Sequence, residues 1–323
     1  MLSLICAHHK FLLKSRVPRK NGRLGADEGR YIKYFQVLPL SRLSANVNAI
    51  FDSSRVVPLE KEKLNYWAGV LNTARTTACP IEQVSKQLKG ELFPRPDAYG
   101  IQELQMKLRL SQGEKQVGWK MGLTSEAKRK QMNLDSPLYG FLLDSMTVSS
   151  GGGFPLKGSI HPKIEPEVAF LIEKDLKGSV TREEVLQACG GIAAALEILD
   201  SRYQEFKYFS MEDVIADNSS SSHFVVGPWE RNFQKLNLKN LSMTMKINNQ
   251  TVQTGSSEAI SGDPVLSVIQ LCQLLAERDQ VLKAGSVVLA GAATAAEALK
   301  PEMQVTLEVE SLPTVSVSIK GNS

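Results

Sequence analysis

The sequence predicts an α+β fold in which helices near the N-terminus precede a mixed β-sheet. Apolar residues recur at the spacing of an amphipathic helix between residues 59 and 108. Beyond residue 116, short apolar stretches follow at irregular intervals with few helical segments between them, which favours a mixed sheet over a doubly wound one. The glycine run at residues 151–153 lacks the spacing of a dinucleotide-binding loop and the Lys-Ser/Thr of a phosphate-binding loop.

The helical region is expected to span residues 56–115 and to contain three helices. The first covers residues 59–77, where apolar side chains recur every three or four positions. A short second helix is expected at residues 81–88, after a proline. Asp97 is a residue type that caps helices, so we expect it to begin the third.

The remaining residues, 116–323, are expected to form a catalytic domain built on the mixed sheet. Thr181 and Glu184 have the spacing of a capping box, which predicts a helix at residues 181–189. A longer helix is expected at residues 264–278. Strands are expected at residues 117–122, 165–172, 241–247, 286–290, 304–309 and 314–319.

Charge is distributed unevenly along the chain. Residues 1–50 contain nine basic and two acidic residues, a surplus of +7, so the net charge of +4 leaves −3 for the rest. This body lacks the basic surplus of a nucleic-acid-binding protein, and we expect no such partner. The composition of residues 1–55 is typical of an organelle presequence and also of a disordered tail; we prefer the tail.

The cysteines and the apolar segments limit which metal sites and which cellular locations are expected. None of the four cysteines forms a C-x-x-C pair, which argues against a thiolate metal site. Cys189 and Cys272 lie in apolar segments and are expected to be small buried side chains. We see no secretory segment and no apolar run of about 20 residues, so we expect a cytoplasmic protein that does not enter a membrane.

Glu165 and Glu167 are the most informative residues of the chain. They lie two positions apart in an expected strand, so their side chains point to the same face. A third carboxylate, Glu197, lies in another apolar run. Oxygen ligands suit a hard divalent ion such as Mg²⁺ or Mn²⁺. The alternative is a solvated face on an edge strand, where such pairs are common.

Five sequence blocks in this order resemble the hydratase/decarboxylase branch of the fumarylacetoacetate hydrolase superfamily. The resemblance extends from about residue 59 to residue 319 and implies the mixed β-sheet roll of the family's C-terminal domain, preceded by helices. The blocks are residues 118–125 (GWKMGLTS), 137–140 (PLYG), 161–167 (HPKIEPE), 197–203 (EILDSRY) and 215–221 (IADNSSS). Pro166 stands where a small residue is commoner in the family, and it leaves one strand edge without an N–H.

The resemblance also implies roles for individual residues. Glu165, Glu167 and Glu197 would ligate Mg²⁺ or Mn²⁺, and Lys120 would be a catalytic or substrate-polarising lysine. Ser220 and Thr294 align with residues that border the substrate. Taken alone, Lys120 is equally compatible with a surface lysine, because a buried ammonium requires a paired anion. The resemblance further implies a homo-oligomer and an association between decarboxylase and hydratase.

The substrates implied are small 2-oxo acids. Their carboxylate and 2-oxo oxygen together chelate a divalent ion, which acts as a Lewis acid towards charge developing next to C2. His161 and His223 are further candidates for ligands or bases. For His161 we favour a structural role, since three carboxylates suffice for a hard ion.

Two positions favour decarboxylation of 4-oxalocrotonate (2-oxohex-3-enedioate) over hydration of 2-hydroxypenta-2,4-dienoate. Leu138 stands where hydratases of the family carry Asp, a plausible proton shuttle for water addition. Tyr203 follows the Ser-Arg pair as it does in the decarboxylases. The alternatives are a hydratase, an inactive paralogue that serves as a scaffold, and a lyase from elsewhere in the superfamily. The intact Lys120 and glutamates argue against inactivity.

Overall fold

The computed structural model describes residues 58–125, 129, 136–206 and 210–321, and all structural statements concern these residues. Residues 58–323 form one compact unit. The expected tail, residues 1–55, therefore lies outside the described residues. The division of the remainder at residue 115 stays a prediction.

Three helices precede the first strand, as expected, but two of them differ in detail. The expected second helix is reduced to four residues, because the backbone of Ile81 pairs with residues 202–204 as an isolated β-bridge to Tyr203. Asp97 does not cap the third helix. Pro94 occupies the cap position, and the Asp97 carboxylate accepts a hydrogen bond from the backbone N–H of Leu59 at 2.7 Å. The three helices are α2 (Lys61–Thr77), α3 (Val84–Gln87) and α4 (Arg95–Ser111).

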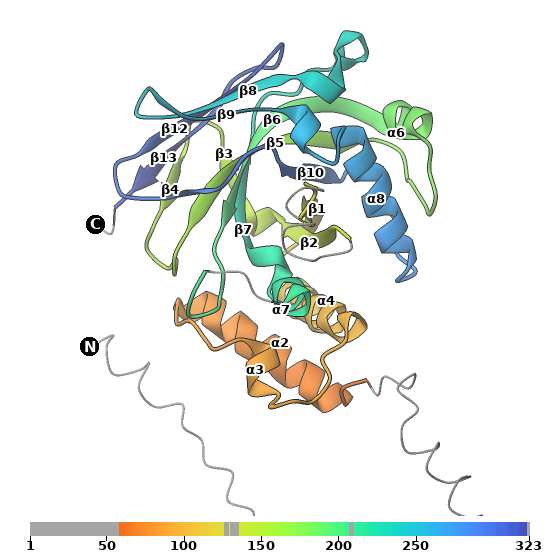
Figure 1. The fold of residues 1–323 in the computed structure, drawn as a ribbon, viewed down its shortest axis with the longest axis vertical. Coiled ribbons are helices and arrows are strands. Elements are labelled where there is room, and N and C mark those ends of the chain that lie inside the picture. Colours follow the sequence, from red (N-terminus) through yellow and green to blue (C-terminus); the bar gives the residue numbers. More distant parts are fainter. Residues whose placement is uncertain (1–57, 126–128, 130–135, 207–209, 322–323) are drawn as a thin grey trace, which may run out of the picture. The chain divides into compact units, whose positions relative to one another are not determined.

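Helices α2 and α4 pack against each other, and α4 also contacts the short helix α7 (Met211–Ala216), which joins the helices to the sheets (Figure 1). Amide side chains of α4 fix this arrangement. Gln102 donates to the carbonyl oxygens of Tyr139 and Ile215, and Gln105 donates to that of Ala216.

The larger sheet has eight strands and curls into a roll. Its order is β2-β1-β10-β5-β6-β7-β3, with β11 beside β5. Strands β2 and β3 stand at opposite ends of this order, yet only the 3₁₀ turn Asp144–Met146 separates them in the chain. The two ends of the sheet are thus brought close together. The strands are β1 (Gln116–Gly122), β2 (Leu138–Leu143), β3 (Thr147–Ser149), β5 (Lys163–Ile172), β6 (Cys189–Leu199), β7 (Ser221–Val226), β10 (Val287–Ala292) and β11 (Glu297–Ala298).

The smaller sheet packs against β6 and β7 and completes the mixed architecture (Figure 1). Its order is β4-β13-β12-β8-β9. The ring of Phe154, on β4, contacts the ring of His223, on β7, edge to face at 4.9 Å across the interface. The strands are β4 (Gly153–Pro155), β8 (Ser242–Ile247), β9 (Gln250–Ser256), β12 (Gln304–Val309) and β13 (Val315–Lys320).

Two more helices cover the larger sheet, α6 (Arg182–Ala188) and α8 (Pro264–Ala276). The capping box of Thr181 and Glu184 begins α6 as predicted. Cys189 and Cys272 are buried, also as predicted.

One stretch, Ser257–Ala276, is long and apolar enough to cross a membrane by length and composition alone, contrary to the expectation that no such run exists. Half of it is buried inside the protein. Its regular helix α8 has only 13 residues, about 20 Å, whereas a membrane core is about 30 Å thick. Helix α8 packs against β10 and β2, so it is a core helix.

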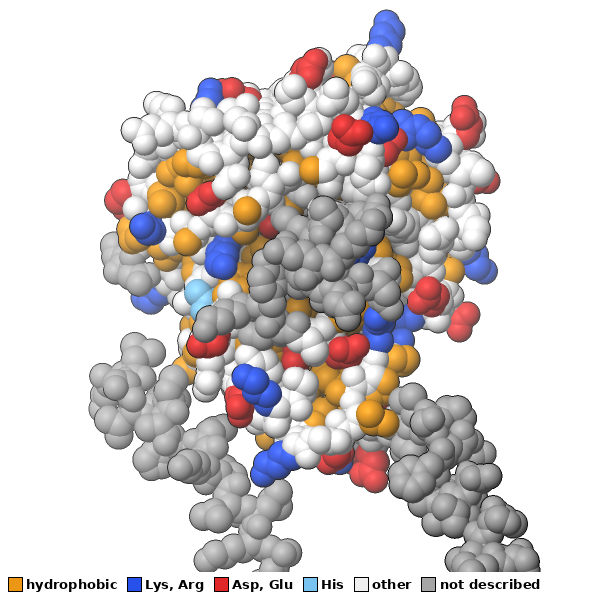
Figure 2. Space-filling model, viewed as in Figure 1, with side chains coloured by type: hydrophobic (Ala, Val, Ile, Leu, Met, Phe, Trp, Pro, Cys, Tyr) orange, Lys and Arg blue, Asp and Glu red, His pale blue; other side chains and the backbone are white. Residues whose placement is uncertain are grey.

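On the face of the molecule shown in Figure 2, Lys and Arg side chains are interspersed with Asp and Glu over the described surface.

Candidate metal centre and active site

Strand register brings the three glutamates together. Strands β5 and β6 are antiparallel, and Glu165 lies directly opposite Glu197, while Glu167 lies opposite Ala195. Paired residues point to the same face of a sheet, and so do residues two apart. All three carboxylates therefore project from one face. Strand β5 has neighbours on both sides, so the edge-strand interpretation of this pair is wrong.

The same argument places Lys120 on that face. Lys120 is paired with Leu289 of β10, and Leu289 is paired with Ala169, two residues after Glu167 on β5. Because the sheet curls, the Lys120 Nζ reaches across to donate a hydrogen bond to Glu197 Oε2 at 2.9 Å. Lys120 is only 2% exposed, which excludes the surface-lysine alternative.

The carboxylates have the geometry of a site for a hard cation. One oxygen from each of Glu165, Glu167 and Glu197 lies within 4.8 Å of the others. Two oxygens on opposite sides of an ion are separated by twice the metal–oxygen distance, about 4.0–4.2 Å for Mg²⁺ and about 4.6–5.2 Å for Ca²⁺. Glu167 Oε1 and Glu197 Oε1 are buried and have no hydrogen-bond partner. Buried carboxylate oxygens require a partner, and a divalent ion between them supplies it.

The electrostatics of the cluster agree with this fit. Burial raises the pKa of Glu167 well above its ordinary value, and the charges of Glu197 and Glu165 raise it further. Burial alone lowers the pKa of Lys120, but the three carboxylates, Glu197 foremost, outweigh it and raise that pKa. Three carboxylates face a single ammonium, so a divalent cation balances the remaining negative charge.

Backbone geometry supports Glu167 from the neighbouring strand. The N–H of Gly291 donates to Glu167 Oε2 at 2.7 Å. Gly291 has φ +114°, and an added Cβ would lie 2.4 Å from the hydroxyl oxygen of Thr124, so only glycine fits here.

Pro166 is accommodated by an irregularity in β10. Its carbonyl accepts a hydrogen bond from Ala293, so its missing N–H also faces that side. Strand β10 changes register there, between Leu289 and Ala292. The expected unpaired edge is thus confined to this break, and the pairing with β6 continues through Pro166.

Leu138 lies on the same face as Lys120. It is paired with Gly122, two residues beyond Lys120 on β1, and its side chain is fully buried. Gly122 leaves space that Leu138 and Ser219 fill: an added Cβ would lie 2.8 Å from Leu138 Cδ1 and 2.7 Å from Ser219 Oγ.

Ser220 belongs to an unusual turn. Three successive residues, Asn218, Ser219 and Ser220, have φ between 50° and 55°, a region that non-glycine residues rarely adopt. The Ser220 hydroxyl donates to Asp217 Oδ2 at 3.3 Å. Asp217 is also bound by the buried guanidinium of Arg202. Sequence patterns gave no sign of this turn, because three successive left-handed residues lack a distinctive composition.

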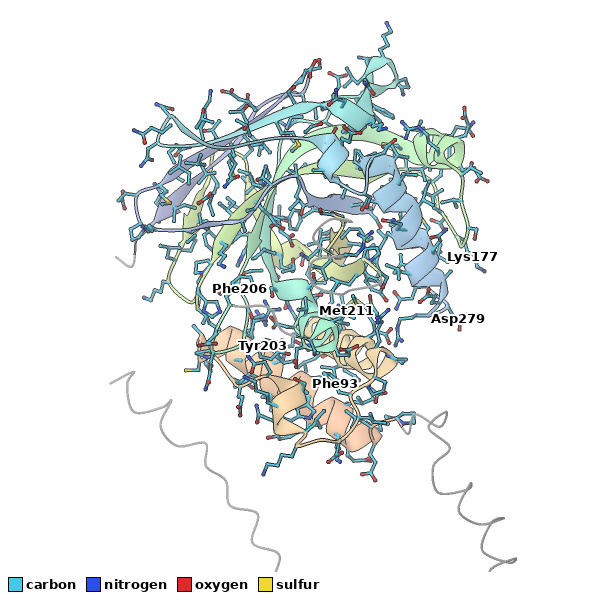
Figure 3. All side chains as sticks on the ribbon, in the orientation of Figure 1. Phe93, Lys177, Tyr203, Phe206, Met211 and Asp279 are labelled. Carbon is cyan, nitrogen blue, oxygen red and sulfur yellow. The ribbon has the colours of Figure 1, made fainter. Side chains whose placement is uncertain are left out.

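Of the other candidates, Thr294 lies two residues after Ala292, which is paired with Glu167 on β5. Thr294 is half-buried, just after β10. Tyr203 is buried below β7, where its hydroxyl donates to the Asp213 carbonyl of α7, next to Met211 in Figure 3. His223 faces the smaller sheet, and the ring of His161 packs against that of Phe206. Neither histidine joins the carboxylate cluster found among the described residues.

Comparison with known proteins gives consistent results. Residues 110–320 match the family model described as fumarylacetoacetate (FAA) hydrolase C-terminal. A 4-oxalocrotonate decarboxylase from Pseudomonas sp is 44% identical over 225 residues, 70% of this chain and 87% of the relative. A 2-hydroxyhexa-2,4-dienoate hydratase from Comamonas testosteroni is 37% identical over 224 residues, 68% of this chain and 82% of the relative.

A solved structure is also similar. The 4-oxalocrotonate decarboxylase from Pseudomonas putida G7, complexed with magnesium and adipate, superimposes with a TM-score of 0.77 at 34% identity. The match covers 81% of this chain and 98% of that one. The predicted α+β fold is confirmed, and the chain belongs to the fumarylacetoacetate hydrolase family.

Proposed function

We propose that this chain is a metal-dependent decarboxylase that converts 4-oxalocrotonate to 2-hydroxypenta-2,4-dienoate in the meta-cleavage degradation of aromatic compounds. The observation that carries the proposal is the buried carboxylate cluster with two unpartnered oxygens, ion-paired to Lys120. Glu165, Glu167 and Glu197 would hold Mg²⁺, with Mn²⁺ as a possible substitute. The decarboxylase relatives, at 34–44% identity, support this choice of reaction.

The reaction requires an electron sink at one end of the substrate. The C5–C6 bond breaks to release CO₂, and its electron pair moves through the C3–C4 double bond towards the C2 oxygen, which takes up one proton. When bound, the divalent ion supplies Lewis-acid stabilisation of the charge that develops on that oxygen.

Each of the candidate residues has a proposed part in the reaction. Lys120 is protonated and buried, so its ammonium offers a fixed positive charge to the developing anion, where low local dielectric strengthens the interaction. The glutamates fix the position of the ion. Leu138 presents an apolar surface, provides no acid and excludes water at the other end. Ser220 and Thr294 are proposed to border the substrate, on the family resemblance.

Product analysis tests this proposal. With Mg²⁺ present, the protein should release one CO₂ per 2-oxohex-3-enedioate and should hydrate 2-hydroxypentadienoate only slowly. Faster conversion of the dienoate to 4-hydroxy-2-oxopentanoate than release of CO₂ would establish the hydratase alternative, which the hydratase relatives represent. A protein with neither activity would leave the inactive scaffold and the lyase from elsewhere in the superfamily as the alternatives.

The role of Leu138 gives a first prediction. Leu138→Asp places a proton-transferring carboxylate on the face that carries Lys120, so we expect it to gain measurable hydration of 2-hydroxypentadienoate. The control is Leu138→Asn, which places a polar side chain of similar size at the same buried position but cannot shuttle a proton. Equal hydration by both variants would contradict the proposed role of position 138.

The family resemblance also supports proposals about the oligomeric state and the cellular location of the protein. We propose a homo-oligomer, cytoplasmic, which also associates with the hydratase that consumes its product.

A further inference from the structure

We propose that the hydroxyl of Ser219 recognises the distal carboxylate of the substrate, and thereby selects six-carbon diacids over monoacids. This inference rests on the proposed function for the identity of the substrate. The family resemblance indicates Ser220, not Ser219, as the serine that borders the substrate. The hydroxyls of these two neighbouring residues point to different places in the structure.

Ser219 lies on the face that carries the metal centre. Its Oγ is 2.7 Å from the position that a Cβ on Gly122 would occupy. Gly122 is two residues beyond Lys120 on β1, so that Cβ would point to the same face as the Lys120 side chain. The hydroxyl therefore stands beside Leu138, beyond Lys120 along the strand.

The Ser219 hydroxyl is available to a ligand. It makes no hydrogen bond to another described residue, although Ser219 is only 5% exposed. The hydroxyl of Ser220, by contrast, is already committed to Asp217. Leu138 and Gly122 bring no polar atom to this place, so Ser219 supplies the hydrogen-bond donor beside them.

The fold maintains this position against a conformational cost. Each left-handed residue costs about 1–2 kcal/mol, so the surrounding contacts must impose the turn. The Asn218 side chain pairs with the backbone of Phe141 through two hydrogen bonds, 2.8 and 3.1 Å long, like an added strand residue. Gly140 permits the close approach, since a Cβ there would lie 2.8 Å from the Asn218 carbonyl oxygen.

Arg202 secures the other side of the turn. Its guanidinium donates to the Asp217 carboxylate and carbonyl, and to the carbonyl of Ser221 at 3.0 Å. The turn is thus fixed before substrate arrives, and a preorganised donor loses little entropy on binding. Backbone strain at a preorganised site is typical of functional positions.

The chemistry of the proposed substrate identifies the occupant. If the 1-carboxylate and 2-oxo group bind at the glutamates, the six-carbon chain leads away from them, and its second carboxylate needs a donor. A hydroxyl recognises this carboxylate without the strong neutralisation by a full positive charge. An ammonium at that point would stabilise the carboxylate that must leave as neutral CO₂ and would raise the barrier.

Calorimetry tests the inference without turnover. The ligands are 2-oxoadipate and 2-oxohexanoate in the presence of Mg²⁺; both chelate through the 2-oxo acid, and only the first has a distal carboxylate. Neither has the C3–C4 double bond that decarboxylation requires. The wild-type protein should prefer 2-oxoadipate, and Ser219→Ala should weaken that ligand about tenfold while leaving 2-oxohexanoate unchanged.

Ser219→Gly provides a second variant, because glycine adopts this backbone without strain. It should show the same selective loss of binding with no loss of thermal stability. Ser311→Ala is the matched control, an exposed serine with φ 63° that lies between two strands of the smaller sheet. It should bind both ligands normally.

Three results would overturn the inference. They are wild-type binding that ignores the distal carboxylate, Ser219 variants that bind both acids normally, and Ser219 variants that weaken both acids equally. A protein that shows the predicted selectivity but releases no CO₂ from 2-oxohex-3-enedioate would refute the proposed function and leave this inference intact.

Discussion

Lys120 combines two conditions that a catalytic ammonium requires, burial and a fixed partner. Lys120→Ala removes the positive charge beside the proposed electron sink and leaves Glu197 without its hydrogen bond. We expect kcat to fall on the order of 10²-fold or more, as for loss of one preorganised electrostatic group. Steady-state kinetics with Mg²⁺ measures this, and Lys246→Ala is the control, because Lys246 is a half-buried lysine of the smaller sheet that is ion-paired to Glu308. A fall of less than about threefold would remove Lys120 from the mechanism.

His223 is expected to make the stability of the protein depend on pH. Burial lowers the pKa of His223 to about 4, and the charges of Arg109 and Arg75 act in the same direction. Below about pH 6.5 the unfolded chain takes up a proton that the folded protein refuses, so stability is lost as pH falls. Above that pH the contribution is complete.

Chemical denaturation between pH 6.5 and 4 measures this effect. The wild-type protein should lose up to about 3 kcal/mol more than His223→Gln over this interval, since glutamine does not titrate. Glutamine retains a partner for the hydroxyl of Ser222, which lies 2.8 Å from His223 Nδ1. Identical pH profiles would show that His223 protonates freely in the folded state.

At the scale of elements, the turn at residues 217–221 depends on one buried ion pair. Arg202 is 4% exposed and Asp217 is fully buried. Arg202→Met leaves the Asp217 carboxylate buried without its cation, so we expect the free energy of unfolding to fall by about 3–5 kcal/mol. The double variant Arg202→Met with Asp217→Asn should recover part of that loss, which urea denaturation would reveal. No recovery would mean that the two residues do not act as a pair.

Local sequence predicted strands β1 and β5, which carry Lys120, Glu165 and Glu167, but it did not predict β6, which carries Glu197. The alternation around Glu165 and Glu167 predicted a strand with both side chains on one face, and Thr181 with Glu184 predicted the start of α6. The prediction that Asp97 begins α4 was wrong, because a residue type that often caps helices can also bind a distant group. Here the Asp97 carboxylate binds the backbone N–H of Leu59. The helix predicted at residues 81–88 is shorter than expected, because the β-bridge of Ile81 overrides helix propensity at its start.

Long-range pairing explains what the sequence could not predict about the site. Glu197 meets Glu165 because of register, and Lys120 reaches Glu197 because β10, some 170 residues later in the chain, lies between β1 and β5. Ser219 was not among the candidate residues, because no local pattern distinguishes its hydroxyl from that of Ser220. The residue roles assigned from the resemblance, including Ser220 and Thr294, stay predictions.

At the scale of the whole molecule, the site is built from strands that are far apart in the sequence. Glutamates from β5 and β6, a lysine from β1 and a glycine N–H from β10 converge on one face of the roll. Their carboxylates carry more negative charge than Lys120 balances, so the molecule as a whole is expected to bind a divalent ion and to be stabilised by it.

The central claim is that this carboxylate cluster holds the metal on which turnover depends. Titration of the metal-free protein with Mn²⁺, followed by the electron paramagnetic resonance signal of free Mn²⁺ and by CO₂ release from 2-oxohex-3-enedioate, tests it directly. We predict one tight site per chain, and activity that rises with its occupancy. Glu165→Gln, Glu167→Gln and Glu197→Gln should each weaken the site and abolish activity in a folded protein, because a neutral amide competes poorly with the hydration of the ion. Undiminished CO₂ release after exhaustive chelation, or unchanged Mn²⁺ binding in the three variants, would contradict the claim.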